Sequence, residues 1–400
     1  MKLLLVNRHF GHPQVPTGRM LADVARELAD RGHTVTVFTT LSSYAGRHAG
    51  ERIPAGLRIH YAWSLKERYR LLNWLLFLIQ ALIVTLVSEW ERCLILTDPP
   101  FLGLCAFAGT RFGFARRRVY WWTMDLYPES LSAAGLVRTG GVIDRVLRQI
   151  NEITLRHTKA VICLDSAQVR RLIEYRSFRS SPRFCRVIPP WDDRPIGMSL
   201  RKDNRFLIKY GLLGMRVALY AGNLGQAHSY RDILAAARLL SQQGRTDWRI
   251  VFVSRGAKRK QLEAAASEVP GVLVLDYQPP ELTADLLSAA DVHLLTMSPG
   301  WEGIVVPSKL YGMLKTGRPI LFIGPDNCGT AQEITSSGAG VILAPETPSG
   351  VIVETLDRLY ASPTQFPTDN SCARITEVAD FLTEGVESKS DHPYPCPAIT

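Results

Sequence analysis

Basic residues at predicted helix starts carry the most specific chemical signal in this sequence. The run "VVPSKLYGMLKTGRP" (305–319) is bounded by Pro307 and by Gly317-Arg318-Pro319, which suit the first position and the exit of a helix. Lys309 falls in the first turn, where the positive end of the helix dipole favours Asp or Glu. An anionic ligand would remove this conflict, because it accepts hydrogen bonds from free backbone N–H groups and pairs with the ammonium.

A second run in the same half of the chain repeats this pattern. The stretch "SRGAKRKQLE" (254–263) ends an apolar strand and opens a helix with four basic residues: Arg255, Lys258, Arg259 and Lys260. Upstream, a strand ends in the turn Gly222-Asn223-Leu224-Gly225, whose glycines would let backbone N–H groups approach a phosphate. Together these features predict a diphosphate site. The alternative is an ordinary turn with solvated Lys and Arg side chains at loop tips.

Alternating strand and helix patterns must position these residues. Short apolar runs such as "KLLLV" (2–6), "TVTVFTT" (34–40) and "MRVALYAGN" (215–223) alternate with amphipathic stretches, which predicts parallel sheets flanked by helices. The 400 residues exceed one hydrophobic core, and a Pro-rich, charged stretch interrupts the rhythm at 189–204.

We therefore predict an α/β protein with two doubly wound, Rossmann-like domains. The predicted parts are an N-terminal domain (1–190), a linker (191–204), a C-terminal domain (205–360), a helical segment that packs back on the first domain (361–387) and a disordered tail (388–400).

The first domain offers carboxylates where the second offers cations. Ligands of open parallel sheets bind beyond the carboxyl ends of the strands, so two such domains predict a central cleft. Asp98 in "TDPPF" and Asp125 in "TMDLYPES" each end a strand, and Gly18 opens the helix after a long first loop. His9 and His12 in that loop could transfer protons or have a structural role. The sequence has no H-E-x-x-H or D-x-D motif, so no metal is expected.

Charge and hydropathy point to a membrane surface. The net charge is +10, with many arginines in the first half. The uncharged stretch 71–87 lies between two strand-like runs, which favours a crossover helix that is buried or partly laid on a bilayer over a spanning one. Lys66, Arg68 and Arg70 before it suit lipid headgroups. Nucleic acid is not expected, because stacking aromatics and DNA-binding motifs are lacking. Seven scattered cysteines favour a reducing cytoplasm.

Four segments resemble the family-4 retaining glycosyltransferases of the GT-B fold, in particular the WbuB-type sugar transferases of bacterial surface polysaccharides. They are "RGHTVTVFTT" (31–40), "DLYPES" (125–130), "YAGNLG" (220–225) and "EGIVVPSKLYGMLKTGRPI" (302–320), and the last is the most specific. The resemblance runs from Met1 to about residue 385. It implies retention at the anomeric carbon, no metal or other cofactor, and a nucleoside diphosphate sugar as co-substrate.

The resemblance also implies that the N-terminal domain (1–190) binds the acceptor and that the C-terminal domain (205–360) binds the nucleotide sugar, and it implies roles for single residues. Catalytic roles would fall to Asp125, Glu302 and Lys309, and the acceptor would meet Gly18, Asp98 and Asp125. The donor would meet the following residues: Gly222, Asn223, Leu224, Gly225, Arg255, Lys260, Tyr277, Gln278, Pro307, Ser308, Lys309 and Leu310. The expected acceptor is a saccharide linked to polyprenyl diphosphate, and the expected location is the cytoplasm at the inner face of the membrane.

Two positions depart from the family pattern. Gly312 stands where many relatives carry a Glu for the ribose, and Met124 stands where many carry a His before the Asp of the D-L-x-P segment. Two alternatives therefore stay open. One is a nucleotide-sugar 2-epimerase of the same fold, with Glu302 and His293 as its candidate groups. The other is a catalytically silent partner subunit of a transferase.

Overall fold

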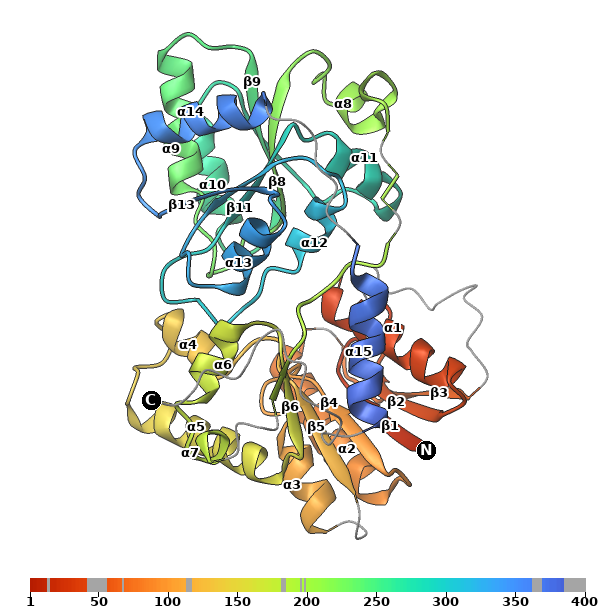
Figure 1. Cartoon of the computed structure of the whole chain (residues 1–400). Coiled ribbons are helices and arrows are strands. Elements are labelled where there is room, and N and C mark those ends of the chain that lie inside the picture. Colours follow the sequence, from red (N-terminus) through yellow and green to blue (C-terminus); the bar gives the residue numbers. More distant parts are fainter. Residues whose placement is uncertain are drawn as a thin grey trace. The chain divides into compact units, whose positions relative to one another are not determined.

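The computed structural model describes residues 1–12, 15–41, 56–66, 68–112, 117–180, 185–194, 196–197, 199–361 and 369–384 (Figure 1). The chain forms two compact units. The first contains Met1–Trp191, the short segment Gly303–Val306 and the chain from Asn370 onward; the second contains Asp192–Glu302 and Pro307–Asp369. The predicted disordered tail, 388–400, lies outside the described residues, as does part of the predicted segment 361–387.

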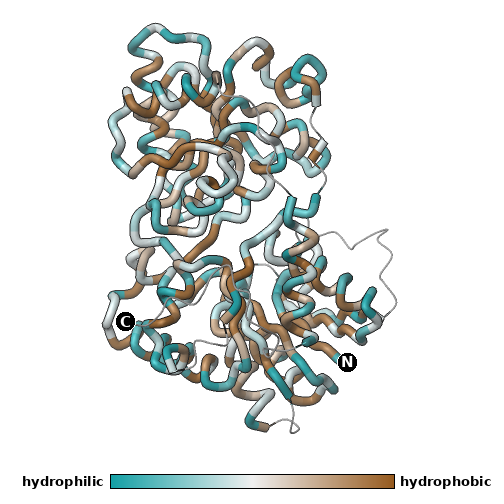
Figure 2. Tube along the Cα trace, viewed as in Figure 1, coloured by the Kyte–Doolittle hydropathy of each residue, from teal (hydrophilic) through white to brown (hydrophobic). Residues whose placement is uncertain are grey.

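The first unit is built on a seven-stranded parallel sheet in the order β3-β2-β1-β4-β5-β6-β7. Its strands are β1 Lys2–Val6, β2 Thr34–Thr40, β3 Leu57–Ala62, β4 Arg92–Ile95, β5 Arg118–Trp122, β6 Ala160–Cys163 and β7 Cys185–Val187. The predicted runs 2–6 and 34–40 form β1 and β2, and Figure 2 shows hydrophobic residues, in brown, along the strands of this sheet. The outermost strands β3 and β7 were not predicted, because β3 is largely exposed and β7 has only three residues.

Helices cover this sheet, and their apolar faces form the core with the strands. They are α1 Pro16–Asp30, α2 Arg70–Val87, α3 Leu104–Arg111, α4 Glu129–Ala133, α5 Val142–His157, α6 Ser166–Leu172, α7 Arg176–Arg179 and α15 Ser371–Thr383. The last helix in sequence, α15, lies beside the first, α1 (Figure 1). An Arg31–Asp380 ion pair of 2.6 Å and an edge contact between the rings of Tyr120 and Phe381 hold it there.

Helix α2 is the crossover between β3 and β4, as its place in the sequence predicts. Only Phe77, Ala81 and Thr85 are buried, and Phe77 stacks on Phe38 with ring centroids 5.3 Å apart. The polar residues Asn73 and Gln80 exchange hydrogen bonds with the backbone after β3. Gln80, for example, accepts from the N–H and donates to the carbonyl of residue 63, each at 2.9 Å. The apolar residues on the face of α2 that points away from the sheet are exposed to solvent.

The second unit contains a six-stranded parallel sheet in the order β10-β9-β8-β11-β12-β13. Its strands are β8 Arg216–Asn223, β9 Trp248–Arg255, β10 Val272–Leu275, β11 Val292–Thr296, β12 Ile320–Ile323 and β13 Gly340–Leu343. Its α-helices are α8 Arg205–Lys209, α9 Arg231–Gln242, α10 Arg259–Ala266, α11 Thr283–Ser288, α12 Lys309–Leu314, α13 Gly329–Ser336 and α14 Ser349–Tyr360. The two parallel-sheet α/β units confirm the predicted fold class.

Candidate functional site

In the second unit, the glycine turn and the basic loop form one structure at the carboxyl ends of β8 and β9. The strands pair to their last residues, with Asn223 opposite Arg255. The Leu224 N–H donates to the Arg255 carbonyl at 2.6 Å, and the Lys258 N–H donates to the Leu224 carbonyl at 3.3 Å. Gly256 has a φ of +120°, and a Cβ there would lie 2.6 Å from the Leu224 carbonyl oxygen. Only glycine permits this close packing of the two loops.

Lys309 reaches this turn from α12. Its Cδ lies 2.9 Å from the point that a Cβ on Gly222 would occupy, and Gly222 has a φ of +145°. The Lys309 ammonium donates to the Tyr220 hydroxyl at 2.6 Å and lies 4.0 Å from the centre of that ring. The structure thus brings together two motifs that are 87 residues apart in the sequence.

The helix that carries Lys309 is shorter than its sequence suggests. We predicted that Pro307 would be the first helical residue, but α12 begins at Lys309, with Ser308 as its N-cap, and has six residues. Pro307 therefore precedes the cap. The prediction that Lys309 lies in a first turn without acidic residues is confirmed.

Lys309 is a cation in an unfavourable environment. Burial lowers the pKa of its ammonium to about 7. Within the described residues Lys309 forms no ion pair with a carboxylate, and its hydrogen bond goes to the neutral Tyr220 hydroxyl. A bound anion would restore the charged form, because an opposite charge offsets the cost of desolvation.

His228 is a residue of this site that the sequence did not reveal. Its Nδ1 lies 2.5 Å from the Thr296 carbonyl oxygen at the end of β11. Burial, followed by the nearby charge of Lys309, lowers the pKa of His228 to about 3. The ring is therefore neutral at pH 7, with Nδ1 as the donor to the carbonyl. The available signal was its position six residues after Gly222, which alone is weak.

The basic residues of the 254–263 run divide into two pairs. Lys258 donates to the carbonyls of Gln226 and His228 at 2.8 and 2.6 Å, and Arg259 is bound to the Leu275 carbonyl and to Glu263. These two side chains stabilise the loop. Arg255 and Lys260 are exposed, and the Arg255 guanidinium stacks over the Tyr277 ring at 4.8 Å. They are the members of the cluster with cationic groups open to a ligand.

The other residues of the second unit that we predicted to contact the donor differ in which of their groups a ligand could reach. Leu224 and Leu310 are buried, so only their backbone groups could meet a ligand. Gln278 is tied to α8, since its Oε1 accepts from Lys209 at 3.3 Å and from Tyr210 at 3.1 Å. Glu302 lies in a turn and accepts from the Gly300 N–H at 3.1 Å.

In the first unit, the predicted acceptor residues gather at the carboxyl ends of the strands. Asp98 forms an ion pair with Arg8 at 3.1 Å and lies 3.2 Å from His9 Nε2. Gly18 packs against the loop that carries His9, because a Cβ on Gly18 would lie 3.1 Å from the His9 carbonyl carbon. Gly18 therefore supports His9, whereas His12 is buried. Arg8 was not identified from the sequence.

Asp125 completes this acidic site. Its N–H donates to the Thr97 hydroxyl at 3.2 Å. Although part of its side chain is exposed, desolvation raises the pKa of Asp125 to about 6, and the charge of Asp98 raises it further. The preceding Met124 is buried, and its carbonyl accepts from the buried Gln168 amide at 2.7 Å.

A buried polar network lies under the segment that follows Asp125. The Tyr175 hydroxyl donates to Glu129 at 2.5 Å, and the Asn151 amide donates to the Tyr127 carbonyl at 2.5 Å and to Tyr175 at 3.0 Å. Because buried polar groups are costly unless satisfied, this network fixes the "DLYPES" segment in one arrangement. This network was not predicted, because its members come from three segments that are far apart in the sequence.

His293 and Gly312, which the sequence analysis linked to alternative functions, are both buried in the second unit. His293 is fully buried in β11, its Nε2 lies 3.0 Å from the Thr316 hydroxyl, and burial lowers its pKa to about 3. That placement disfavours a proton-transfer role in an epimerase. Gly312 is buried too, and a Cβ there would lie 3.2 Å from the Asp192 carboxylate. Among the described residues, no group of three or more His, Cys, Asp or Glu side chains could hold a metal ion.

Comparisons with known proteins agree with this architecture. Residues 17–191 match the model of a glycosyl transferase 4-like domain, and residues 215–362 match that of the glycosyl transferases group 1. A Pseudomonas aeruginosa protein named as a probable glycosyltransferase, WbjE, is 24% identical over 227 residues, which are 56% of this chain and 55% of the relative. The chain thus spans about half the length of the curated relative it matches.

Solved structures share the whole fold at low sequence identity. WaaG, a glycosyltransferase involved in lipopolysaccharide biosynthesis, gives a TM-score of 0.63 at 16% identity, over 96% of this chain and 100% of that one. Sucrose-phosphate synthase from Thermosynechococcus elongatus gives 0.67 at 15% identity, over 95% of both chains. The chain belongs to the GT-B glycosyltransferases, with a family-4-like first domain and a group 1 second domain.

Proposed function

We propose that this glycosyltransferase moves a sugar from a nucleoside diphosphate sugar to a saccharide carried on polyprenyl diphosphate, with retention and without a metal. The product would enter a cell-surface polysaccharide, in keeping with the involvement of the structurally similar WaaG in lipopolysaccharide biosynthesis. The single observation that carries the donor assignment is Lys309, a partly buried cation that has no carboxylate partner among the described residues and lies against the glycine turn of β8.

The chemistry of the leaving group explains this arrangement. When the bond to the sugar breaks, negative charge grows on the diphosphate oxygens. Lys309, Arg255, Lys260 and the N–H groups of the 222–225 turn would stabilise that charge more strongly than the ground state, which lowers the barrier. Tyr277 and Gln278 would lie toward the nucleobase, and Glu302 would contact the donor sugar. The Asp98–Asp125 cluster supplies hydrogen-bond acceptors for the hydroxyl groups of a saccharide acceptor.

Calorimetry with UDP, ADP and GDP tests the donor site directly. We expect one of them to bind the wild type, and Lys309→Ala to lose most of that affinity while its melting temperature stays near that of the wild type. Arg249→Ala is a matched control, since Arg249 lies on β9 and is bound to the backbone carbonyls of Thr246 and Trp248. If Lys309→Ala and Lys260→Ala both bind like the wild type, the diphosphate assignment is wrong.

Turnover separates the transferase from its alternatives. Purified protein with a nucleotide sugar and a lipid extract should release the nucleoside diphosphate. Release that requires the extract identifies a transferase, whereas deuterium entry at C2 of the sugar without an acceptor would identify a 2-epimerase. Nucleotide binding without turnover under any of these conditions would favour a silent partner subunit.

The exposed face of α2 supports contact with the inner surface of the cell membrane from the cytoplasm. Within the described residues, α2 is the one helix long and apolar enough to cross a bilayer, yet it is anchored to the sheet through Phe77. Six apolar residues on its outward face are each at least half exposed: Leu71, Leu72, Leu75, Ile79, Ile83 and Val87. Exposed Lys66, Arg68 and Arg70 at its start complement anionic headgroups.

Vesicle flotation tests this contact. Ile79→Ser with Ile83→Ser replaces two exposed apolar side chains and should reduce binding to vesicles of phosphatidylglycerol and phosphatidylcholine. Leu200→Ser with Ile208→Ser, at exposed positions of the second unit, is the matched control and should leave binding unchanged. Equal binding of the two double variants would exclude α2 as the membrane contact.

A further inference from the structure

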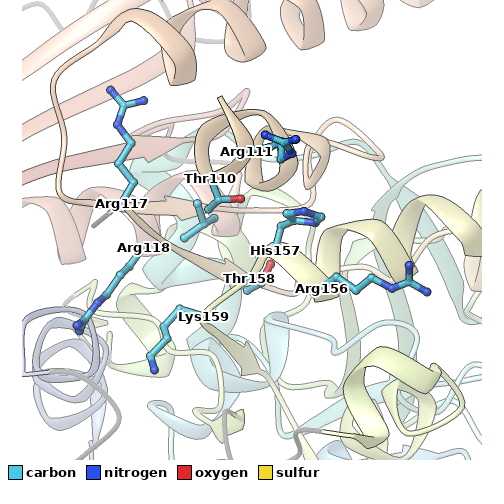
Figure 3. Close-up of a pocket in the computed structure, with 9 residues that line it drawn as sticks. Thr110, Arg111, Arg117, Arg118, Arg156, His157, Thr158 and Lys159 are labelled. Atoms are coloured by element: carbon cyan, nitrogen blue, oxygen red, sulfur yellow. The ribbon is translucent and has the colours of Figure 1, made fainter. Parts of the chain in front are cut away.

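A basic pocket lies at the opposite edge of the first sheet from Asp98 and Asp125. Its volume is about 330 Å³. In the described part of the chain, its lining has five Arg or Lys side chains, one His and no carboxylate: Thr110, Arg111, Arg117, Arg118, Val119, Arg156, His157, Thr158 and Lys159. Figure 3 shows that these side chains come from three separate segments of the chain.

The topology explains how these segments meet. Arg111 ends α3, Arg156 and His157 end α5, Arg118 begins β5 and Lys159 immediately precedes β6. Strands β5 and β6 are parallel neighbours, and both helices run back to the amino edge where those strands begin. The pocket therefore belongs to the amino edge of the sheet, where ligands of open parallel sheets do not normally bind.

Some of this positive charge has an ordinary structural reason. Arg111 and Arg156 lie in the last turns of helices, where cations interact favourably with the helix dipole. Arg117 donates to the carbonyls of Thr85, Leu86 and Ser88 at 3.0, 3.2 and 2.6 Å and thereby caps the end of α2. Neither reason accounts for the exposed Arg118, which begins β5.

The neighbourhood of the pocket indicates the source of its ligand. Arg117 connects the pocket to the end of α2, where Val87 is 73% exposed, and Phe112, next to Arg111, is 67% exposed. Cations beside exposed apolar side chains are typical of surfaces that meet the boundary between lipid headgroups and acyl chains. Among the lining residues that the structure describes there is no Phe, Tyr or Trp on which a nucleobase could stack.

We infer that this pocket binds the phosphate of an anionic phospholipid headgroup. Arg118 and Lys159 would contact the phosphate oxygens, Arg111 and Arg156 would add long-range attraction, and the hydroxyls of Thr110 and Thr158 could donate hydrogen bonds. The inference rests on the proposed membrane contact of α2, and it adds a specific headgroup site at one end of that helix.

The test compares two charge-matched double variants. Arg118→Ser with Lys159→Ser removes two pocket cations, and Lys202→Ser with Arg238→Ser removes two exposed cations from the second unit. Flotation is measured with vesicles of phosphatidylglycerol and phosphatidylcholine and with phosphatidylcholine alone. We expect the pocket variant to bind the anionic vesicles roughly tenfold more weakly than the control variant. Both should bind neutral vesicles and the nucleoside diphosphate like the wild type.

Two results would overturn the inference. The first is equal binding of both double variants to anionic vesicles. The second is saturable binding of free glycerol 1-phosphate that only the pocket variant loses, with unchanged vesicle binding, since this would assign the pocket to a soluble phosphate. A failure of α2 as the membrane contact is distinguishable, because Ile79→Ser with Ile83→Ser would then leave binding to neutral vesicles unchanged.

Discussion

The carboxyl ends of the two parallel sheets differ in the charged side chains that were predicted to meet a ligand. In the second unit, the loops after β8 and β9 and the start of α12 present Arg255, Lys260 and Lys309. In the first unit, the loops after β4 and β5 present Asp98 and Asp125. The two units share a doubly wound architecture, so the fold determines where a ligand binds, and the residues in its loops determine which ligand.

Burial shifts the pKa values of Lys309 and Asp125 in opposite directions, and both shifts are toward neutral pH. It lowers the pKa of Lys309 to about 7 and raises the pKa of Asp125 to about 6. In each case burial disfavours the charged form. A ligand can therefore change the protonation state of either residue near physiological pH. The following predictions test whether the cationic edge and the acidic edge serve the two substrates separately.

The largest expected effect is at the cationic edge. Lys309→Met should lower kcat by roughly a hundredfold to a thousandfold, because it removes a charge that stabilises the leaving diphosphate. Steady-state kinetics with the identified donor would measure this change. An effect on KM alone, with kcat unchanged, would show that Lys309 contributes only to ground-state binding.

Asp125→Asn tests the acidic edge. We expect kcat to fall by about a hundredfold, while the affinity for the nucleoside diphosphate stays unchanged. In the wild type, activity should rise with pH through about 6 as Asp125 ionises, and the Asn variant should lack this rise. A loss of nucleotide affinity in Asp125→Asn would contradict the separation of the two edges.

Proton uptake on nucleotide binding would sharpen the comparison. Near pH 7.5 the Lys309 amine is largely neutral in the free protein, and a bound diphosphate should raise its pKa. Binding should therefore take up a fraction of one proton, and affinity should fall as pH increases from 6.5 to 8.5. Calorimetry in two buffers of different ionisation enthalpy measures the uptake, which should be absent in Lys309→Met and intact in Asp125→Asn.

Arg255→Ala and Lys260→Ala should have smaller effects. Both side chains are exposed, so solvent and salt screen their attraction for a phosphate. We expect a decrease in nucleotide affinity of a few fold for each, which should shrink further in 0.5 M salt. Lys258→Ala provides the contrast: it should destabilise the loop, because Lys258 binds the carbonyls of Gln226 and His228.

The smallest effect concerns stability. The folded-state pKa of Asp125 is raised above the ordinary value of 3.8, so the ionised carboxylate destabilises the folded protein. The penalty is absent below pH 4, develops between pH 4 and 6 and is complete above pH 6. Asp125→Asn should therefore melt on the order of 1 °C higher than the wild type at pH 7.5 and equally at pH 4. Scanning calorimetry at both values would measure this difference.

The sequence by itself determined the alternation of strands and helices, because buried parallel strands need apolar runs that few other structures require. The runs 2–6, 34–40 and 215–223 coincide with β1, β2 and β8. It also identified Lys309 and the 222–225 turn, since a cation at a helix start and glycines after a strand conflict with ordinary propensity. It missed β3 and β7, whose short or exposed strands lack that pattern.

Only the tertiary structure decided which of these residues act together. Gly222 and Lys309 meet because β8 ends and α12 begins at the same edge of the sheet, and His228 joins them through a carbonyl of β11. Lys258 and Arg259 proved to be structural, because their hydrogen-bond partners lie on other segments. The physical reason is that burial and charge pairing depend on distances in space, and residues far apart in the sequence set those distances.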